Sequence, residues 1–245
     1  RAVDIEFPEA IDPRLVAARL IELSANRDGF IADLSPAGRP GAMLVGSSPE
    51  VLVKRQGSTV SAFPLAGSSP RRATAAEDHI AGQDLLHSAK DLHEHSFVVE
   101  HLRRVLSPLC ERLDIPDTPQ LISTNEMWHL GTPISGTLKD KDLTALELAL
   151  AAHPTPAICG TPAEAAQALI ETAETDRGFY AGAVGWCDSS GDGEYMVAIR
   201  CAEVAGDGLS ARAWAGGGIV GDSDAHAELE ETTAKLRTIL KALSL

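Results

Sequence analysis

The sequence predicts an α+β fold with large, mainly antiparallel β-sheets that pack face to face and are flanked by helices. Three observations predict this class. Short apolar runs come mostly in pairs joined by turn residues, which is typical of antiparallel hairpins. Helical stretches stand singly between these pairs instead of following every strand. The 245 residues contain no internal repeat, and 44% of them are hydrophobic, so we expect one domain with a full core over residues 1–245.

Strands predominate in the first part of the chain. A helix is expected over residues 12–23, with a proline in its first turn and with Leu15, Leu20 and Leu23 buried. Residues 66–72 read as a loop of small residues that ends in two arginines. The expected strands are residues 1–7, 30–34, 42–45, 51–53 and 60–65.

A capping box at residues 74–77 opens a helical region, and within it the run from Asp84 to Leu113 reads as helix. Its apolar residues recur three or four positions apart, which places them on one face of a helix; they are Val98, Leu102, Val105, Leu109 and Leu113. Glu94 lies four residues before Val98 and therefore on the same face. A carboxylate in line with a buried stripe is unfavourable unless something pairs with it. Glu94 either marks the point where the stripe reaches solvent or points into a site and holds a cation.

The last predicted helix, residues 225–243, has a polar flank beside its apolar face. The apolar face consists of Leu229, Leu236, Leu240 and Leu243. Glu228, Glu231 and Lys235 share the flank. Glu231 and Lys235 alone would form an ordinary exposed ion pair, whereas two carboxylates one turn apart also suit Mg²⁺, which takes one or two carboxylates together with waters and a substrate anion. Before this helix we expect strands at 121–124, 127–130, 180–187, 195–204 and 209–215 and helices at 143–152 and 163–174.

Two further features have both a structural and a functional interpretation. The run Gly216–Gly218 is either a tight connection between a strand and a helix or a place where backbone N–H groups approach an anion closely. Arg200 follows a run of apolar residues in a strand. It either forms a structural salt bridge or binds a substrate carboxylate through two parallel hydrogen bonds.

The composition excludes several classes of function. The formal net charge of −14 argues against a nucleic-acid-binding surface, although a few local cations are enough to bind a small anion. No apolar run reaches the length of a membrane span, so we expect a cytoplasmic protein without membrane contact. The four cysteines lack CxxC spacing, which predicts free thiols rather than structural zinc; they are Cys110, Cys159, Cys187 and Cys201.

Eight stretches, taken together and in order, resemble the chorismate-binding enzymes, the family of isochorismate, anthranilate, aminodeoxychorismate and salicylate synthases. They are residues 46–50 (GSSPE), 64–68 (PLAGS), 90–95 (KDLHEH), 128–133 (WHLGTP), 153–157 (HPTPA), 185–188 (GWCD), 199–202 (IRCA) and 215–220 (AGGGIV). The likeness covers essentially the whole chain and implies the fold shared with anthranilate synthase component I. Residues 96–101, which follow Glu94-His95, look like the isochorismate synthases of siderophore pathways, and this argues against a glutamine amidotransferase partner.

The resemblance implies a reaction and a set of site residues. The reaction is the Mg²⁺-dependent conversion of chorismate to isochorismate, in which water adds at C2 and the 4-hydroxyl leaves. Glu50 would be the general acid, with its pKa raised by burial, and His129 would hydrogen-bond near the leaving hydroxyl. Glu94 and Glu231 would hold Mg²⁺, with Glu228 nearby. The substrate would contact Gly67, Ser68, Ala157, Tyr180, Ile199, Arg200, Trp214, Gly216, Gly217, Gly218 and Lys235.

The sequence departs from the family pattern at one point. The lysine that activates water in the family lies before the position matched by Arg1, and neither Lys54 nor Lys90 matches it. An N-terminal segment of the domain is therefore expected to be missing, and residues 1–245 alone are expected to be inactive or poorly folded. We expect a monomer or weak dimer. The alternatives are a salicylate synthase, which also eliminates pyruvate, and a non-catalytic homologue or fragment that binds chorismate.

Overall fold

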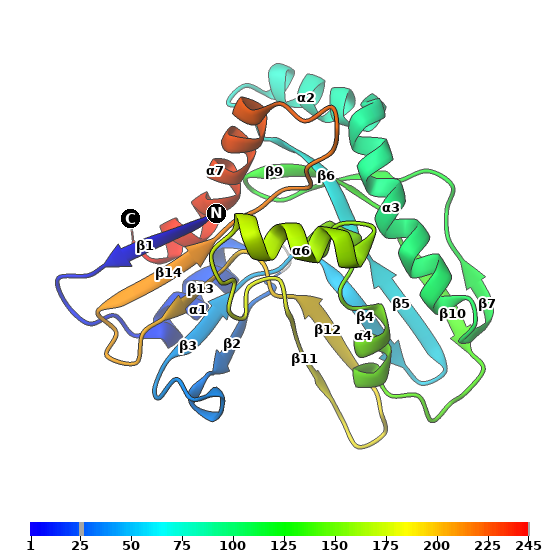
Figure 1. Cartoon of the computed structure of the whole chain (residues 1–245), viewed down its shortest axis with the longest axis horizontal. Helices are drawn as coiled ribbons and strands as arrows, with labels where there is room; N and C mark the ends of the chain where they lie inside the picture. The colour runs from blue at the N-terminus through cyan, green and yellow to red at the C-terminus, as the bar shows by residue number, and fades with distance from the viewer. Residues whose placement is uncertain (25–26, 245) are drawn as a thin grey trace.

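The computed structural model describes residues 1–24 and 27–244. Within them the chain forms three sheets in which every strand pair is antiparallel, with helices packed against the sheets, and this confirms the predicted α+β class (Figure 1). Their strand orders are β1-β14-β13-β3-β2, β11-β12-β4-β5-β10-β7 and β6-β9-β8. The sheets therefore join segments that are far apart in the sequence.

The five-stranded sheet is covered on one face by two helices. Its strands are β1 (Ala2–Glu6), β14 (Ser210–Trp214), β13 (Cys201–Val204), β3 (Met43–Gly46) and β2 (Phe30–Asp33), and a short 3-10 turn, η1 (Ser35–Ala37), follows β2. The covering helices are α1 (Pro13–Leu23) and α7 (Ala225–Ala242). Leu20 of α1 and Ile239 of α7 are fully buried in the core that they form with Ala213 of the sheet.

Two leucines predicted to be buried in these helices are exposed. Leu15 is 60% exposed, because the buried stripe of α1 runs through Val16 and Leu20 and Leu15 lies beside it. Leu229 is 50% exposed, because the first turns of α7 border a surface hollow and the sheet lies under the later turns.

The six-stranded sheet forms a second core with two other helices. Its strands are β11 (Ala183–Cys187), β12 (Gly193–Val197), β4 (Val51–Gln56), β5 (Thr59–Phe63), β10 (Ile134–Leu138) and β7 (Cys110–Asp114). Leu102 of α3 (Ala89–Leu106) and Leu148 of α4 (Ala145–Ala152) pack on this sheet. The two larger sheets meet in a smaller cluster that contains Phe30, Leu44 and Cys201.

The predicted start of the helical region is confirmed, because the Thr74 side chain accepts the N–H of Glu77 where the first helix begins, but the run from Asp84 to Leu113 is not one continuous helix. The chain forms α2 (Ala75–His87), breaks at Ser88 and continues as α3. Ser88 has extended backbone angles, and its hydroxyl accepts the N–H of Asp91, so it begins α3. The last part of the predicted helix is strand β7. Leu109 and Leu113 do contact the core, but residues four apart share a face in a strand as well as in a helix, so their spacing could not exclude a strand.

Two other predicted segments are also corrected. Residues 66–72 are not a loop, because β6 (Leu65–Pro70) pairs with β9 (Met127–Gly131), which also pairs with β8 (Gln120–Ser123). The predicted strand 195–204 is two strands, β12 and β13, which belong to different sheets. The chain crosses between the two sheets at Arg200, which has a positive φ of 52°. This crossing places the Arg200 side chain where the two larger sheets meet.

Two further helices complete the fold. The helices α5 (Pro156–Cys159) and α6 (Ala163–Ala173) lie between α4 and β11 in the sequence, and α6 crosses in front of the sheets in Figure 1. All four cysteines are free thiols. Within residues 1–24 and 27–244, no helix has the length and apolar character that a membrane span requires.

Candidate active site

A cavity of about 120 Å³ lies among the ends of the sheets and helices. Gly67 and Ser68 reach it from β6, His129 from β9, Glu94 from α3 and Lys235 from α7. All predicted substrate-binding residues and the predicted acid line this cavity; the remaining members are Glu50, Ala157, Tyr180, Ile199, Arg200, Trp214, Gly216, Gly217 and Gly218. The resemblance therefore selected residues from nine separate segments that the fold brings to one place.

Glu50 lies just before β4 and is only 4% exposed. Burial raises the pKa of its carboxyl to about 7, and this effect outweighs the Leu65 backbone hydrogen bond and the charges of Lys235 and Arg200, which lower it. A carboxyl group with this pKa carries a proton at neutral pH in a substantial fraction of molecules. Glu50 therefore has the property that a general acid needs.

His129 is a neutral imidazole facing the same cavity. It lies opposite Ser68 in the pairing of β6 with β9. Burial, together with the positive charges of Arg200 and Lys235, lowers its pKa well below the usual value. Its Nε2 atom lies 3.4 Å from Nη2 of Arg200, which is a donor, so Nε2 is the accepting nitrogen.

Arg200 is a buried cation without a carboxylate partner. Its side chain is inaccessible to bulk solvent apart from the cavity, since the residue is 7% exposed. Among the residues that the structure describes, no Asp or Glu oxygen lies within 4 Å of the guanidinium. Burial lowers its pKa from the usual value. A buried, unpaired guanidinium is unfavourable, and an anionic ligand would remove this penalty.

The aromatic residues Tyr180 and Trp214 form one wall of the cavity. Their rings are stacked, with centroids 6.0 Å apart and an interplanar angle of 8°. Burial raises the pKa of Tyr180 to about 12, so the hydroxyl keeps its proton. A Cβ atom added at Gly216 would lie 3.1 Å from this hydroxyl, so a side chain at Gly216 would crowd the wall.

Three carboxylates converge on the next two glycines. A Cβ atom at Gly217 would lie 3.0 Å from Oε2 of Glu228 and 3.1 Å from Oε1 of Glu231, and one at Gly218 would overlap the carboxylate of Glu94. The glycines thus leave space that side chains would fill. Burial raises the pKa of Glu94 to about 7, and the negative charge of Glu231 adds to this effect. Glu94 therefore points into a site, as one of the two interpretations of its position predicted.

Two lysines neutralise the other carboxylates. Nζ of Lys235 donates to Oε1 of Glu231 at 2.5 Å and to the carbonyl of Gly216 at 3.0 Å. Nζ of Lys90 donates to Oε1 of Glu228 at 3.0 Å. Glu228 and Glu231 do not line the first cavity. Together with Lys90 they border a second hollow, of about 740 Å³, between α2 and α7.

The carboxylates fit Mg²⁺ in their chemistry. Across residues 1–24 and 27–244, no three His, Cys, Asp or Glu side chains are grouped closely enough to form a metal cage. Mg²⁺ does not require such a cage, because it usually binds one or two protein carboxylates together with waters and substrate oxygens. Glu94 and Glu231, whose like charges already repel each other, suit that role, with Glu228 beside them.

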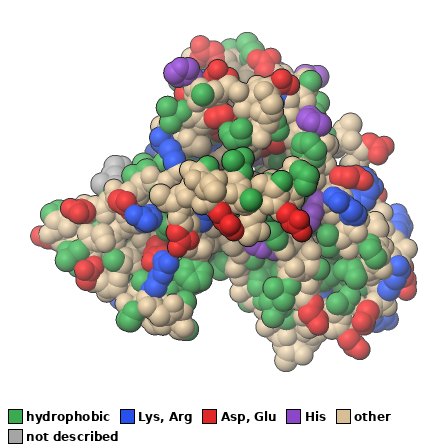
Figure 2. Space-filling view, in the orientation of Figure 1, with side chains coloured by type: hydrophobic (Ala, Val, Ile, Leu, Met, Phe, Trp, Pro, Cys, Tyr) green, Lys and Arg blue, Asp and Glu red, His purple; other side chains and the backbone are tan. Residues whose placement is uncertain are grey.

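Arg177 and Glu174 also line the cavity, and no sequence pattern predicts this. Arg177 binds Glu174 through two hydrogen bonds of 2.7 Å and donates to the carbonyl of Ile158 at 2.8 Å. The two residues lie three positions apart in a polar segment. This spacing is also typical of an exposed ion pair, so only the structure shows that the pair lines the cavity. Figure 2 shows acidic side chains on the exposed side of α6, just before this pair. The other lining residues that the prediction missed are Arg1, Pro49, Leu65, Ala66, Ile158, Ala181 and Ala215.

Comparison with known proteins identifies the family. A family model described as chorismate binding enzyme matches residues 1–244. The chain belongs to the chorismate binding enzymes. This confirms the resemblance that the sequence motifs predicted and agrees with the cavity that those motifs line.

Individual relatives of this family member are isochorismate synthases by name. The Mycobacterium tuberculosis H37Rv protein "Putative isochorismate synthase MenF" is 51% identical over 99% of this chain and 66% of its own length. Isochorismate synthase DhbC of Bacillus subtilis is 46% identical over 99% of this chain and 61% of its own length. The chain thus spans less than two thirds of the length of these relatives.

A solved structure confirms the fold. It is the crystal structure described as "putative 2,3-dihydroxybenzoate-specific isochorismate synthase, DhbC from Bacillus anthracis". It matches with a TM-score of 0.96 and 44% identity, and the match covers 100% of this chain and 65% of that one.

Proposed function

We propose that this chain supplies active-site residues of a Mg²⁺-dependent isochorismate synthase, an isomerase that converts chorismate to isochorismate. The observation that carries the proposal is Glu50, a buried carboxyl with a pKa raised to about 7, which faces the same cavity as the unpaired cation Arg200. The reaction needs a proton donor for the departing 4-hydroxyl and cations for the substrate carboxylates. The names of the relatives support the same assignment.

Each cavity residue has a role in this proposal. Arg200 and Lys235 bind substrate carboxylates, and Glu50 donates its proton to the hydroxyl that leaves C4. His129, neutral and hydrogen-bonded to Arg200, accepts or donates a hydrogen bond beside the ring. When bound to Glu94 and Glu231, with Glu228 nearby, Mg²⁺ would anchor and neutralise the ring carboxylate.

Apolar and small residues shape the rest of the cavity. Tyr180, Trp214, Ile199 and Ala157 pack against the ring and keep bulk water away from it. Backbone groups of residues 67–68 and 216–218 approach the substrate, and at 216–218 a Cβ atom would crowd the site. These residues account for binding and for the acid half of the reaction; we assign no residue of this chain to the activation of water.

The pathway and the partners belong to the same proposal. The description of the Bacillus anthracis structure as 2,3-dihydroxybenzoate-specific supports a role in 2,3-dihydroxybenzoate and siderophore synthesis. The motif after Glu94-His95 supports an enzyme without a glutamine amidotransferase subunit. We also propose a cytoplasmic location and a monomer or weak dimer. Salicylate with pyruvate as products, or chorismate binding without turnover, are the outcomes that would replace this proposal.

The proposal is tested by replacing the acid in the full-length protein encoded by the gene. Glu50→Gln keeps the shape of the side chain and removes the proton, so we expect isochorismate formation to fall by about 10²- to 10⁴-fold, the usual contribution of general acid catalysis. Glu100→Gln is the matched control, because Glu100 has a 66% exposed side chain and lines neither cavity. Wild-type turnover by Glu50→Gln would refute the role of Glu50.

The pH dependence of the reaction rate tests the role of Glu50 independently. Because the donor must carry its proton, the rate in the chorismate-to-isochorismate direction should fall as the pH rises above about 7, the pKa of Glu50. This decrease in rate above pH 7 should be absent in Glu50→Gln. If the variant shows the same decrease, a group other than Glu50 causes it.

A further inference from the structure

Lys90 bridges the two helices that carry the three converging carboxylates. On α3, Lys90 lies one turn before Glu94, and on α7, Glu228 lies one turn before Glu231. The 3.0 Å ion pair between Lys90 and Glu228 joins the two helices at this level. Its side chains are 26% and 11% exposed, so the pair is largely shielded from solvent. Screening by salt is weak for such a pair.

The charges around the site are incompletely balanced. Lys90 neutralises Glu228 and Lys235 neutralises Glu231. Within the part of the chain that the structure describes, Glu94 has no Lys or Arg nitrogen within 4 Å. Two ammonium groups thus face these three carboxylates and Asp91, a fourth carboxylate 4.0 Å from Nζ of Lys90. Each ammonium group pairs with a carboxylate at or beside the proposed metal site.

Lys90 also borders the hollow that adjoins the three carboxylates. The second hollow is bordered by Lys90, Glu228 and Glu231 on the side of the site. Its outer side carries further acidic groups from α2 and α7, namely Glu77, Asp84 and Glu230. Lys90 is the lysine that borders this hollow, whereas Lys235 lines the substrate cavity. A cation in the hollow therefore lies near Lys90 and Arg72, whereas Glu94 lines the substrate cavity.

We propose that Lys90 is an internal counter-ion that holds Glu228 and keeps the binding of a divalent cation weak until the substrate is present. The inference rests on the metal part of the proposed function. With Lys90 in place, the free protein offers the cation few unneutralised carboxylates. The substrate carboxylate supplies the missing negative charge, so cation and substrate bind together. Lys90 is a positioning residue in this account, because it acts through Glu228.

The test is the affinity of the substrate-free, full-length protein for Mn²⁺, measured by calorimetry and by the electron paramagnetic resonance signal of free Mn²⁺. Lys90→Met should bind Mn²⁺ about tenfold more tightly than wild type, since Coulomb's law gives an effect of this size for a monovalent and a divalent cation about 6 Å apart in water. Lys90→Arg keeps the charge and should keep the weak affinity. A purely structural role for Lys90 would give weaker binding or no change.

Control variants separate this inference from the proposed function. Lys241→Met removes the same charge from α7 at an exposed ion pair with Glu126, and it should leave the Mn²⁺ affinity unchanged. Glu231→Gln should abolish binding; if it does not, the metal site itself is misassigned and the proposed function fails with it. If Glu231→Gln abolishes binding but Lys90→Met binds no more tightly than wild type, only the role of Lys90 is overturned.

Discussion

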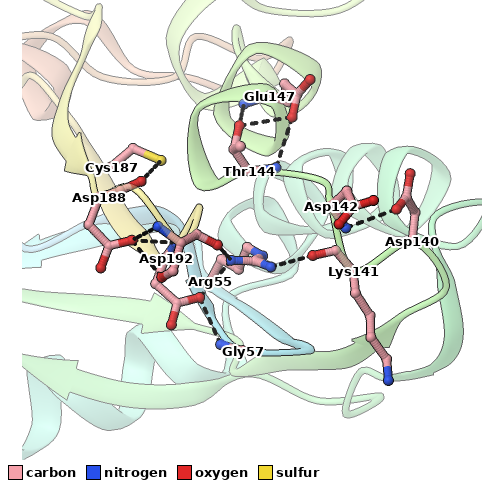
Figure 3. A network of polar contacts seen from close by, with 11 residues as sticks. Arg55, Gly57, Asp140, Lys141, Asp142, Thr144, Glu147, Cys187, Asp188 and Asp192 are labelled. Carbon is pink, nitrogen blue, oxygen red and sulfur yellow. Dashed lines mark hydrogen bonds and ion pairs between the residues drawn. The ribbon is translucent and has the colours of Figure 1, made fainter.

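Two buried arginines of this chain, Arg55 and Arg200, show how similar burial can serve opposite purposes. Arg55 on β4 is 5% exposed and Arg200 is 7% exposed. Figure 3 shows Arg55 among chain groups that point at its guanidinium. It donates to Oδ1 of Asp192 at 2.7 Å and to the carbonyls of Ser190 and Lys141 at 2.9 and 2.5 Å. Among the residues that the structure describes, the guanidinium of Arg200 has a hydrogen-bond contact only with Nε2 of His129, at 3.4 Å.

The difference lies in what surrounds each guanidinium. The loop after β11 wraps around Arg55, and Asp192 also accepts the N–H of Gly57, so the arginine fastens two turns of the six-stranded sheet. Arg200 faces a cavity in place of a loop. Arg55 is paired with a carboxylate of its own chain, although its Nε has no hydrogen-bond partner among the described residues. A buried cation paired in this way stabilises the fold, whereas one left without a carboxylate is an unfavourable group that a ligand can satisfy.

The largest effect expected from this comparison is the loss of activity in Arg200→Met. The variant lacks the buried cation that pairs with a substrate carboxylate, and the loss of this cation should lower kcat/KM by about 10²- to 10³-fold. The melting temperature should not fall, because methionine replaces an unpaired buried charge with an apolar side chain of similar length. Steady-state kinetics and thermal unfolding on the same preparation check both parts. A lower melting temperature would mean that Arg200 is structural.

Arg55→Met should show the reverse pattern. It leaves Asp192 and two carbonyls without their donor, and we expect a loss of about 3 kcal/mol in the free energy of unfolding, reduced from the upper range because Asp192 is partly exposed. For a chain of this size that is a fall of about 6–12 °C in melting temperature. The kinetic constants should stay near wild type at low temperature. A large rise in KM with unchanged stability would contradict the comparison.

The third prediction concerns the free energy of unfolding of Glu50→Gln as a function of pH. Burial raises the folded-state pKa of Glu50 from 4.5 to about 7, so ionisation of this group favours unfolding as the pH rises from 4.5 through 7. The variant lacks this penalty and should be more stable than wild type by about 3 kcal/mol at pH 8, with no difference below pH 4.5. Urea unfolding at both pH values checks this; equal stabilities at pH 8 would show that Glu50 is not held in its neutral form.

The sequence predicted the α+β class and the site residues better than the element boundaries. Turn-linked apolar runs identified most strands, because turn residues and alternation are local signals. The helix over 84–113 failed because steps of four residues fit both a helix and a strand at Leu109 and Leu113. The sequence predicts a loop at strand β6 because the small residues there have low strand propensity, whereas pairing with β9 in the sheet decides their conformation.

The candidate site shows the same limit of local sequence signals. Periodicity placed Glu94 in line with a buried stripe but could not say what it faces, and only the resemblance selected Glu50, which otherwise reads as a loop carboxylate. Arg177 remained hidden because its pairing with Glu174 is local while its place in the cavity depends on long-range packing. Nor could the sequence distinguish Arg55 from Arg200, since partners as distant as Asp192 are set by the fold.

The most direct test of the whole account is the identity of the product formed from chorismate by the full-length protein, resolved by chromatography with Mg²⁺ and with a chelator. We predict isochorismate without pyruvate, formed only when Mg²⁺ is present. Salicylate with pyruvate would move the protein to the neighbouring activity of the same family. Isochorismate formed equally well with the chelator would contradict the role of Glu94 and Glu231, and no conversion of chorismate would contradict the proposed function itself.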